Sequence, residues 1–309
     1  MPLTRENWPI AAGLLQFPNV TADGRPVAEA PDQWAADLAE VADAGFGNVE
    51  IGDGWVRAGD LDTARLGELR RVAAEQGLSI PSVAVIRSSV IDPDNGEDNL
   101  AYGHRTVDAA AELGAGVVSF GLHRALTEPQ RQQLWFWTVD GARDPVGDRG
   151  TWDLAVSRLR ELGKHAAETG LTLSLEMYED TYVGTADSAV RLVTDIGLDN
   201  VGINPDIGNL VRLHRPVEDW REIVRKTAPY VNYWHVKNYF RDEDPASGGV
   251  VTIPAPLELG FINYRHAVRD VIAAGFRGVF CCEHYGGDGL SVSATNQAYL
   301  RRILPTTVE

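Results

Sequence analysis

Four apolar runs in the second half of the sequence each end on a side chain that commonly binds metal ions. The runs close on Glu176, Asp206, His235 and Glu283. Short apolar runs bounded by polar residues are typical of buried strands. Because the carboxyl ends of neighbouring parallel strands meet at one edge of a sheet, these four side chains are expected to converge. The pattern therefore restricts the chain to folds in which consecutive strands run parallel side by side.

Strand-like and helix-like patterns alternate along the whole chain. Strands are expected at residues 10–17, 48–51, 79–86, 116–121, 171–176, 201–206, 233–235 and 278–283. Helices are expected near residues 32–44, 61–76, 99–113, 152–169, 186–196, 217–227 and 264–274, with a last helix capped by Ser291. Eight strand–helix units joined by right-handed crossovers predict a (β/α)₈ TIM barrel. We expect residues 1–309 to form a single catalytic domain.

The long irregular segments follow strands three, four and seven of this scheme. They cover residues 87–98, 122–151 and 239–262, whereas the connections at the other ends of the strands are short. In such barrels the loops after the strands carry the active site. The difference in loop length therefore favours an enzyme with a partly covered pocket.

Charge and composition exclude several classes of partner. The net charge of −16 argues against binding to nucleic acid or to an anionic membrane, because both require clustered Lys and Arg. The N-terminus lacks a signal pattern, and no apolar run approaches a membrane span. Cys281 and Cys282 are adjacent on an expected strand and point to opposite faces, so no disulfide is expected. These features predict a cytoplasmic protein.

Three carboxylates and one imidazole form an oxygen-rich site. Such a set suits Mn²⁺ first, with Mg²⁺, Co²⁺ or Zn²⁺ as alternatives. Glu176 should share its inward direction with Ser174 and Thr172, which are polar, while the leucines between them face the helices. Glu176 and Glu283 could approach a substrate from opposite sides, as removal and return of a proton next to a carbonyl require.

Each of these residues also has a purely structural interpretation. A single acidic residue at a strand end is common, and His235 alone could be a core histidine; four such residues on consecutive strands favour a metal site. Lys237 could stabilise an enolate or protonate a leaving hydroxyl, or it could only pair with a carboxylate. Glu50 could line the pocket or be a buried partner for a cation. His123, which ends strand four, could be an acid or base at the pocket.

An aromatic cluster lies in the long segment after strand four. Trp135 and Trp137 flank Phe136, and such a cluster is more often the core of a loop than a binding surface. If these rings lie exposed at the mouth, they could stack on a sugar ring or an aryl aglycone.

The motifs Leu175-Glu176, Asn204-Pro205-Asp206-Ile207-Gly208-Asn209, Trp234-His235-Val236-Lys237-Asn238 and Cys282-Glu283 resemble the xylose-isomerase-like barrel superfamily. This superfamily includes sugar epimerases, sugar-phosphate isomerases and inosose dehydratases. The resemblance implies that the two Glu ligands also shuttle the proton. It also implies that Arg241, six residues after the His, binds substrate.

Two positions depart from the ketose epimerases that the chain resembles. Those enzymes carry a His three residues after the metal Asp, where this chain has Asn209, a candidate substrate contact. Lys237 fits the His-x-Lys arrangement of the dehydratase and isomerase branches better. Abasic-site endonucleases share the fold, but their multi-zinc sites need a His at the position of Asn209, and the net charge also opposes that function.

The sequence therefore predicts a divalent-metal-dependent sugar isomerase or epimerase that works through an enediolate. The alternative is a lyase on the same scaffold: β-elimination from a 3-keto-glycoside, as in the larger subunit of C-glycoside deglycosidases, or an inosose-type dehydration. A non-catalytic subunit is disfavoured by the intact set of ligands. The expected partner is a small carbohydrate or glycoside, and a homo-oligomer or a small partner subunit stays open.

Overall fold

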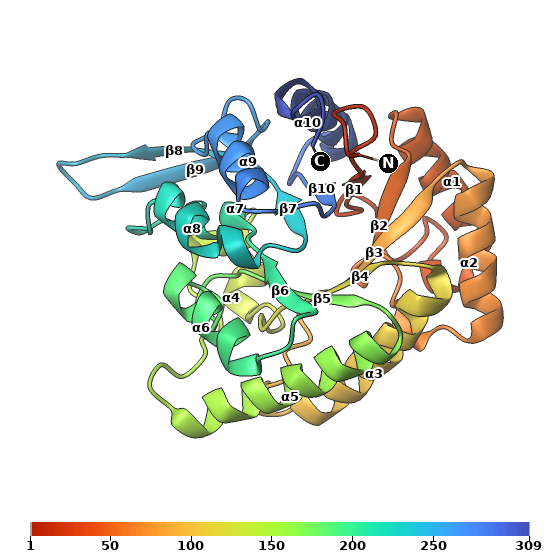
Figure 1. The fold of residues 1–309 in the computed structure, drawn as a ribbon, viewed down its shortest axis with the longest axis horizontal. Helices are drawn as coiled ribbons and strands as arrows, with labels where there is room; N and C mark the ends of the chain where they lie inside the picture. Colours follow the sequence, from red (N-terminus) through yellow and green to blue (C-terminus); the bar gives the residue numbers. More distant parts are fainter. Residues whose placement is uncertain (1, 309) are drawn as a thin grey trace.

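The computed structural model describes residues 2–308 and has the predicted alternation of strands and helices (Figure 1). One parallel sheet contains β1 (Ile10–Ala12), β2 (Asn48–Gly52), β3 (Ser79–Val85), β4 (Val117–Phe120), β5 (Thr172–Glu176), β6 (Val201–Asn204), β7 (Trp234–Val236) and β10 (Phe280–Cys282). Its strand order is β6-β5-β4-β3-β2-β1-β10-β7. Neighbours in space are therefore neighbours along the chain, as a barrel requires.

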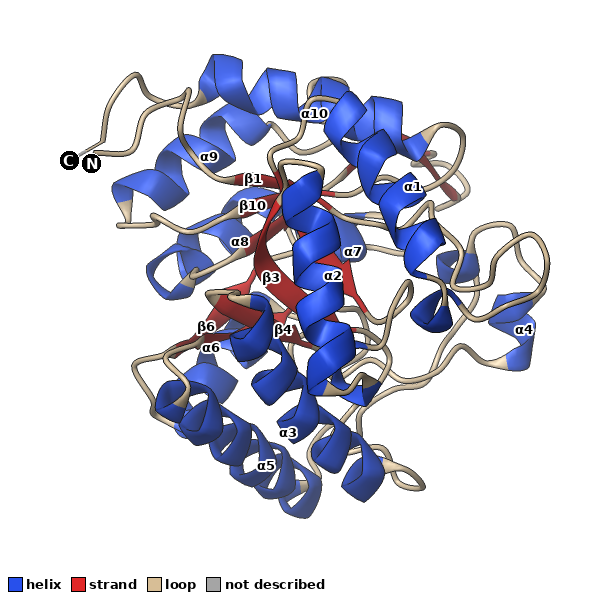
Figure 2. Cartoon of the chain, turned by 90° about the vertical axis from the view of Figure 1, so that its right-hand side faces the viewer, coloured by secondary structure: helices blue, strands red, loops and turns tan. Residues whose placement is uncertain are grey.

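The helices surround this sheet, as Figure 2 shows. They are α1 (Pro31–Asp43), α2 (Thr63–Glu75), α3 (Gly96–Leu113), α4 (Glu128–Arg131), α5 (Arg149–Glu168), α6 (Ala186–Ile196), α7 (Ile207–Val211), α8 (Trp220–Thr227), α9 (Tyr264–Ala273) and α10 (Gly289–Ile303). Eight parallel strands inside a layer of helices form a nearly closed barrel, which confirms the predicted fold class.

The barrel closes between β6 and β7 through few backbone contacts. A single parallel bridge joins Ile203 to Val231. The side chain of Asn204 adds a link, because its Oδ1 accepts the backbone N–H of His235 at 2.8 Å. The Asn204 side chain thus takes the place of a backbone hydrogen bond between β6 and β7, and it fixes the backbone of His235, a predicted metal ligand.

Side chains of one strand alternate between two apolar clusters. Tyr233 and Cys281 belong to a small cluster with Ala11, whereas Trp234 and Cys282 belong to the large core of the protein. His235 and Glu283 have the parity of the small cluster, so they point into the barrel. The opposite directions of the two cysteines leave both as free thiols, as predicted.

The segment after β7 was expected to be irregular, and it contains an antiparallel hairpin instead. Strands β8 (Asn238–Glu243) and β9 (Val250–Ala255) pair along their whole length. Figure 1 shows the hairpin projecting from the barrel. Phe240, Val251 and Ile253 are about half exposed on it. Tertiary pairing within a long connection carries no local signal beyond alternation, which explains the missed strands.

Several helices begin at other residues than predicted: α3 and α5 each begin three residues earlier, and two further starts differ in their caps. The last helix begins at Gly289, and Asp288 rather than Ser291 is its N-cap, because the Asp288 side chain accepts the N–H of Ser291. Helix α8 begins at Trp220, capped by Asp219, three residues later than expected after Pro216. A carboxylate at an N-cap also interacts favourably with the positive end of the helix dipole.

The two ends of the described chain lie side by side in both views (Figures 1 and 2). Leu3 and Val308 form an antiparallel bridge there, on the side of the barrel away from the long loops. None of the helices within residues 2–308 combines the length and the apolar character needed to cross a bilayer.

Candidate metal and sugar site

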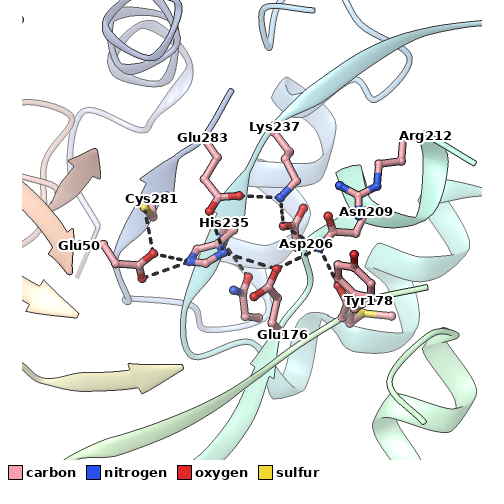
Figure 3. Close-up of polar contacts among 12 residues, drawn as sticks. Glu50, Glu176, Tyr178, Asp206, Asn209, Arg212, His235, Lys237, Cys281 and Glu283 are labelled. Atoms are coloured by element: carbon pink, nitrogen blue, oxygen red, sulfur yellow. Dashed lines mark hydrogen bonds and ion pairs between the residues drawn. The ribbon is translucent and has the colours of Figure 1, made fainter. Parts of the chain in front are cut away.

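The four predicted ligands come together at the carboxyl end of the barrel (Figure 3). Glu176 is the last residue of β5, Asp206 precedes α7, His235 lies in β7, and Glu283 follows β10. His235 Nδ1 lies 3.8 Å from Glu176 Oε1 and 3.5 Å from Glu283 Oε1. Ligand atoms of Glu176, Asp206 and His235 lie within 4.8 Å of one another. All four side chains are buried.

These residues fit a divalent cation. Asp206 Oδ1 and His235 Nδ1 are buried polar atoms, and neither has a hydrogen-bond partner among the described residues. Buried polar atoms are normally satisfied, so two such atoms that face the same small volume fit a cation bound between them. Carboxylate oxygens with one imidazole nitrogen suit a hard or borderline cation such as Mg²⁺ or Mn²⁺.

Glu50 holds the other side of the imidazole. Its Oε1 lies 3.0 Å from His235 Nε2, and its Oε2 also accepts a hydrogen bond from the Tyr233 hydroxyl. A carboxylate on Nε2 fixes that nitrogen as the protonated one and leaves Nδ1 free for a metal. From the sequence, Glu50 could either line the pocket or be the buried partner of a cation. The structure places it against His235, and it also lines a cavity of about 90 Å³ together with Glu283.

The charges of the cluster perturb each other strongly. Burial opposes a charge on His235, but the carboxylates of Glu50 and Glu283 raise its pKa well above the usual range. Burial raises the pKa of Asp206 to about 7, and Glu283 and Glu176 act in the same direction. Without a metal, a proton on His235 therefore balances part of the negative charge that a cation would balance.

Lys237 lies among the same carboxylates. Its ammonium donates to Asp206 Oδ2 and, at 2.5 Å, to Glu283 Oε2. The ion pair considered for Lys237 is therefore present, and its partners are two of the proposed metal ligands. Gly208 permits this approach, because a Cβ there would lie 2.5 Å from Lys237 Cγ and 3.0 Å from its carbonyl oxygen.

Asn209 braces two of the carboxylates. Its Nδ2 lies 3.0 Å from Glu176 Oε1, from Asp206 Oδ2 and from the carbonyl of Met177. Its Oδ1 has no partner among the described residues. The amide therefore positions the cluster, and its oxygen stays free to accept a further hydrogen bond.

His123 faces a separate part of the mouth. Its ring stacks on Tyr178 with centroids 4.3 Å apart, and both residues line a cavity of about 110 Å³. Burial lowers the pKa of His123 to about 3, so the imidazole is neutral at physiological pH. A neutral ring can accept or donate a hydrogen bond to a sugar, but it is a poor acid.

The structure does not bring Arg241 to the cluster. Its Nη1 donates to the carbonyls of Val211 and Leu213, and its Nη2 donates to that of Arg215. Its Nε pairs with Glu243 at 2.6 Å. The guanidinium therefore ties the hairpin to the segment after α7, and its donors are not free for a sugar. The expectation that Arg241 binds substrate has no support in this geometry.

Another arginine, which the sequence analysis missed, lies closer. Arg212 follows α7 and is fully buried, and two of its donors, Nε and Nη1, have no partner among residues 2–308. Its Nη2 pairs with Glu179 at 3.0 Å. Figure 3 shows it beside Asn209, on the same side of the cluster as Lys237. The signal in the sequence was its position three residues after Asn209, which puts both on one face of a helical turn.

The aromatic cluster covers this part of the site. Trp135 and Trp137 stack with centroids 5.0 Å apart, and Trp137 is almost fully buried. The edge of Trp135 reaches Gly286, and Phe136 and Trp137 contact Tyr285. The rings thus act as the core of the loop, as the structural interpretation expected, and this core lies across the mouth of the barrel.

Comparisons with known proteins agree with this architecture. A model of the family described as "Xylose isomerase-like TIM barrel" matches residues 38–303. A xylose isomerase-like TIM barrel protein from Mycobacterium smegmatis, solved in complex with magnesium, is 47% identical, with a TM-score of 0.93 over 97% of this chain and 98% of that chain. An inosose dehydratase from Geobacillus thermodenitrificans is 25% identical over 258 residues, which is 80% of each chain.

More distant structures share the fold alone. The 3-keto-D-glucoside 4-epimerase from E. coli superposes with a TM-score of 0.66 over 96% of this chain and all of that chain, at 16% identity. The match to the family model covers most of the barrel, including every strand-end residue of the cluster. This chain belongs to the xylose isomerase-like TIM barrel family.

Proposed function

We propose that this chain is a divalent-metal-dependent enzyme that moves a proton next to the carbonyl of a small sugar, as an isomerase or epimerase. The observation that carries the proposal is the convergence of Glu176 and Glu283 on His235 Nδ1 from β5 and β10. These strands lie apart in the sheet, so the two carboxylates reach the site from different sides. A cation held by Glu176, Asp206, His235 and Glu283 would polarise the carbonyl and acidify the adjacent C–H bond.

The chain's own residues account for the proton transfers. One of the two glutamates takes the proton from the carbon α to the carbonyl, and the electron pair of the C–H bond moves onto the carbonyl oxygen to give an enediolate. The other glutamate returns a proton to the opposite face, or to the neighbouring carbon. The Lys237 ammonium holds Glu283 in place, and Asn209 holds Glu176.

A second candidate is a lyase that shares the first step. Lys237 favours it, because an ammonium between Asp206 and Glu283 could give a proton to a leaving hydroxyl on the β carbon. The enediolate would then collapse to an enone with loss of water, or of an aglycone from a 3-keto-glycoside. The similarity to an inosose dehydratase supports this alternative.

Proton exchange with solvent separates these functions. The protein loaded with Mg²⁺ or Mn²⁺ is incubated in deuterium oxide with ketohexoses, an inosose and a 3-keto-glucoside, and each sugar is followed by NMR and mass spectrometry. Deuterium at the α carbon with retention of all heavy atoms supports isomerisation or epimerisation. An enone with loss of water or aglycone supports the lyase. Absence of exchange in every sugar by the metal-loaded protein contradicts both.

A further inference from the structure

Two groups of buried polar atoms without a hydrogen-bond partner lie near the barrel mouth. One is the metal end, with Asp206 Oδ1, His235 Nδ1 and Asn209 Oδ1. The other consists of Arg212 Nε, Arg212 Nη1 and the Tyr239 hydroxyl. Both groups are buried, and a buried donor without a partner costs free energy comparable to a lost hydrogen bond. The second group is the one that the proposed chemistry does not use.

Arg212 lies close to the metal end. Its guanidinium carbon is 5.8 Å from the centre of the Tyr285 ring, and Lys237 Nζ is 5.6 Å from the same ring. The Trp137 ring centre lies 5.0 Å from the Arg212 guanidinium carbon and 5.4 Å from the centre of the Tyr239 ring, so Arg212 and Tyr239 both pack against Trp137. One small molecule that touches Lys237 and Asn209 is therefore within reach of the Arg212 group.

The surroundings of Arg212 are typical of a guanidinium held ready for a ligand rather than of a simple ion pair. Rings of Phe136, Trp137 and Tyr178 lie 4.8, 5.0 and 5.3 Å from its guanidinium carbon. Flat rings hold the guanidinium in one orientation and exclude water from it. A guanidinium fixed in this way loses little conformational entropy when it binds a ligand.

The charge of this group selects the kind of ligand. Glu179 accepts from Arg212 Nη2 through both carboxylate oxygens, at 3.0 Å each, so the pair is close to neutral. The nearest further charges at the metal end are mostly negative. A phosphate group there would face these carboxylates, whereas hydroxyl oxygens can accept from Nε and Nη1 at no charge cost.

Backbone strain marks the same side of the mouth. Among the described residues, Arg87 and Asp180 are the non-glycine residues with positive φ, at 58° and 61°. Both line the cavity that also contains His123, Tyr178 and Glu179. Non-glycine residues in this region of backbone space concentrate at functional sites.

From these observations we infer that Arg212 and Tyr239 form the subsite for the end of the substrate remote from the metal, and that this subsite accepts the hydroxyls of an uncharged, unphosphorylated keto-sugar or cyclitol. The inference rests on the proposed function for the identity of the metal end. It assigns to Arg212 the contact that the resemblance implied for Arg241.

Calorimetric titration of the full-length, Mg²⁺-loaded protein tests this subsite. The probes are D-fructose with its 6-phosphate, and myo-inositol with its 1-phosphate. We expect at least one neutral member to bind and its phosphate ester to bind at least about tenfold more weakly. Arg212→Lys retains the positive charge beside Glu179 but removes the planar donors, and should weaken the neutral ligand about 10- to 100-fold. Arg241→Lys is the matched control and should leave its affinity within about twofold.

Four results would overturn the inference: tighter binding of a phosphate ester, no binding of either neutral probe, unchanged affinity in Arg212→Lys, or an equal loss in Arg241→Lys. Thermal unfolding of both variants without sugar checks that they are folded. If Arg212→Lys does not fold, Tyr239→Phe takes its place, with an expected loss of about five- to tenfold. If a neutral sugar binds in a way that depends on Arg212, but its α carbon does not exchange with solvent deuterium, the subsite stands and the proposed chemistry is contradicted. If Arg212→Lys exchanges the α proton of the sugar at the wild-type rate, the proposed chemistry stands and the subsite is contradicted.

Discussion

The carboxyl ends of the strands and the long connections above them supply the site in different ways. Glu176, His235 and Glu283 lie on or next to strands whose register with their neighbours is fixed by the parallel ladder. Arg212 and Trp137 are positioned instead by loop contacts, such as the hydrogen bond of Trp137 Nε1 to Thr252 Oγ1 at 3.3 Å. In the proposed function, the strand ends hold the groups that carry out the chemistry, and the connections hold those that select the substrate.

The largest effect is expected from a change at a strand end, in the glutamate that follows β10. Glu283→Gln removes a proton-transfer group while keeping its shape, and should lower the rate of solvent deuterium exchange about 10³-fold. Glu258→Gln, at an exposed glutamate paired with Arg302, is the control and should keep wild-type activity. A Glu283→Gln protein that exchanges at the wild-type rate would remove Glu283 from the proposed mechanism.

The support of His235 by Glu50 should have the next largest effect. Glu50→Gln weakens the hold on His235 Nε2, and should reduce the affinity for Mg²⁺ or Mn²⁺ about 10- to 100-fold, as for other carboxylates that orient metal-binding histidines. Tyr233→Phe removes only the hydroxyl that donates to Glu50, and a smaller loss is expected. Calorimetric titration with each metal measures both. Equal affinities in all three proteins would show that Glu50 does not orient the ligand.

A partly buried carboxyl near the mouth should make stability depend on pH. Burial raises the pKa of Asp53 to about 7, although its Oδ1 accepts the N–H of Ile86 at 2.8 Å. The folded protein therefore binds the proton more tightly than the unfolded chain. This contribution is fully present below about pH 4 and is lost as pH rises toward 7.

Asp53→Asn should remove that dependence. Between pH 4 and pH 7 the wild-type protein should lose about 2 kcal/mol of unfolding free energy relative to the variant, once partial solvent access is allowed for. Urea unfolding of both proteins across this range measures the difference. Parallel curves at all pH values would contradict the raised pKa.

The last comparison concerns the close approach of α7 to the site. Gly208→Ala places a methyl group against Lys237 and should cost about 1–3 kcal/mol of stability, with a fall in exchange rate, because Lys237 must move. Gly67→Ala is the matched control in α2, where the added methyl group meets open space, and a gain of up to about 1 kcal/mol is expected. A Gly208→Ala protein with wild-type stability and rate would show that this contact tolerates change.

The assignment of the fold and of the acidic cluster needed no long-range information. Tyr233-Trp234-His235 already shows which residues face inward, because strand side chains alternate. Glu50 and His235 are 185 positions apart, and the residues next to each of them in the sequence carry no signal for the pairing. The substrate contact that the resemblance implied for Arg241 has no support in the geometry for a related reason, because the hairpin directs that side chain to the carbonyls of Val211, Leu213 and Arg215.

The sequence by itself determined the barrel and the convergence of Glu176, Asp206, His235 and Glu283, because strand period and parallel order leave few alternatives. Only the tertiary structure decided which arginine keeps free donors and that Glu50 supports His235. It also decided that the Trp135–Trp137 layer lies across the mouth. The physical reason is that ladder geometry repeats from strand to strand, whereas long connections are positioned by individual contacts between distant residues, which no local pattern encodes.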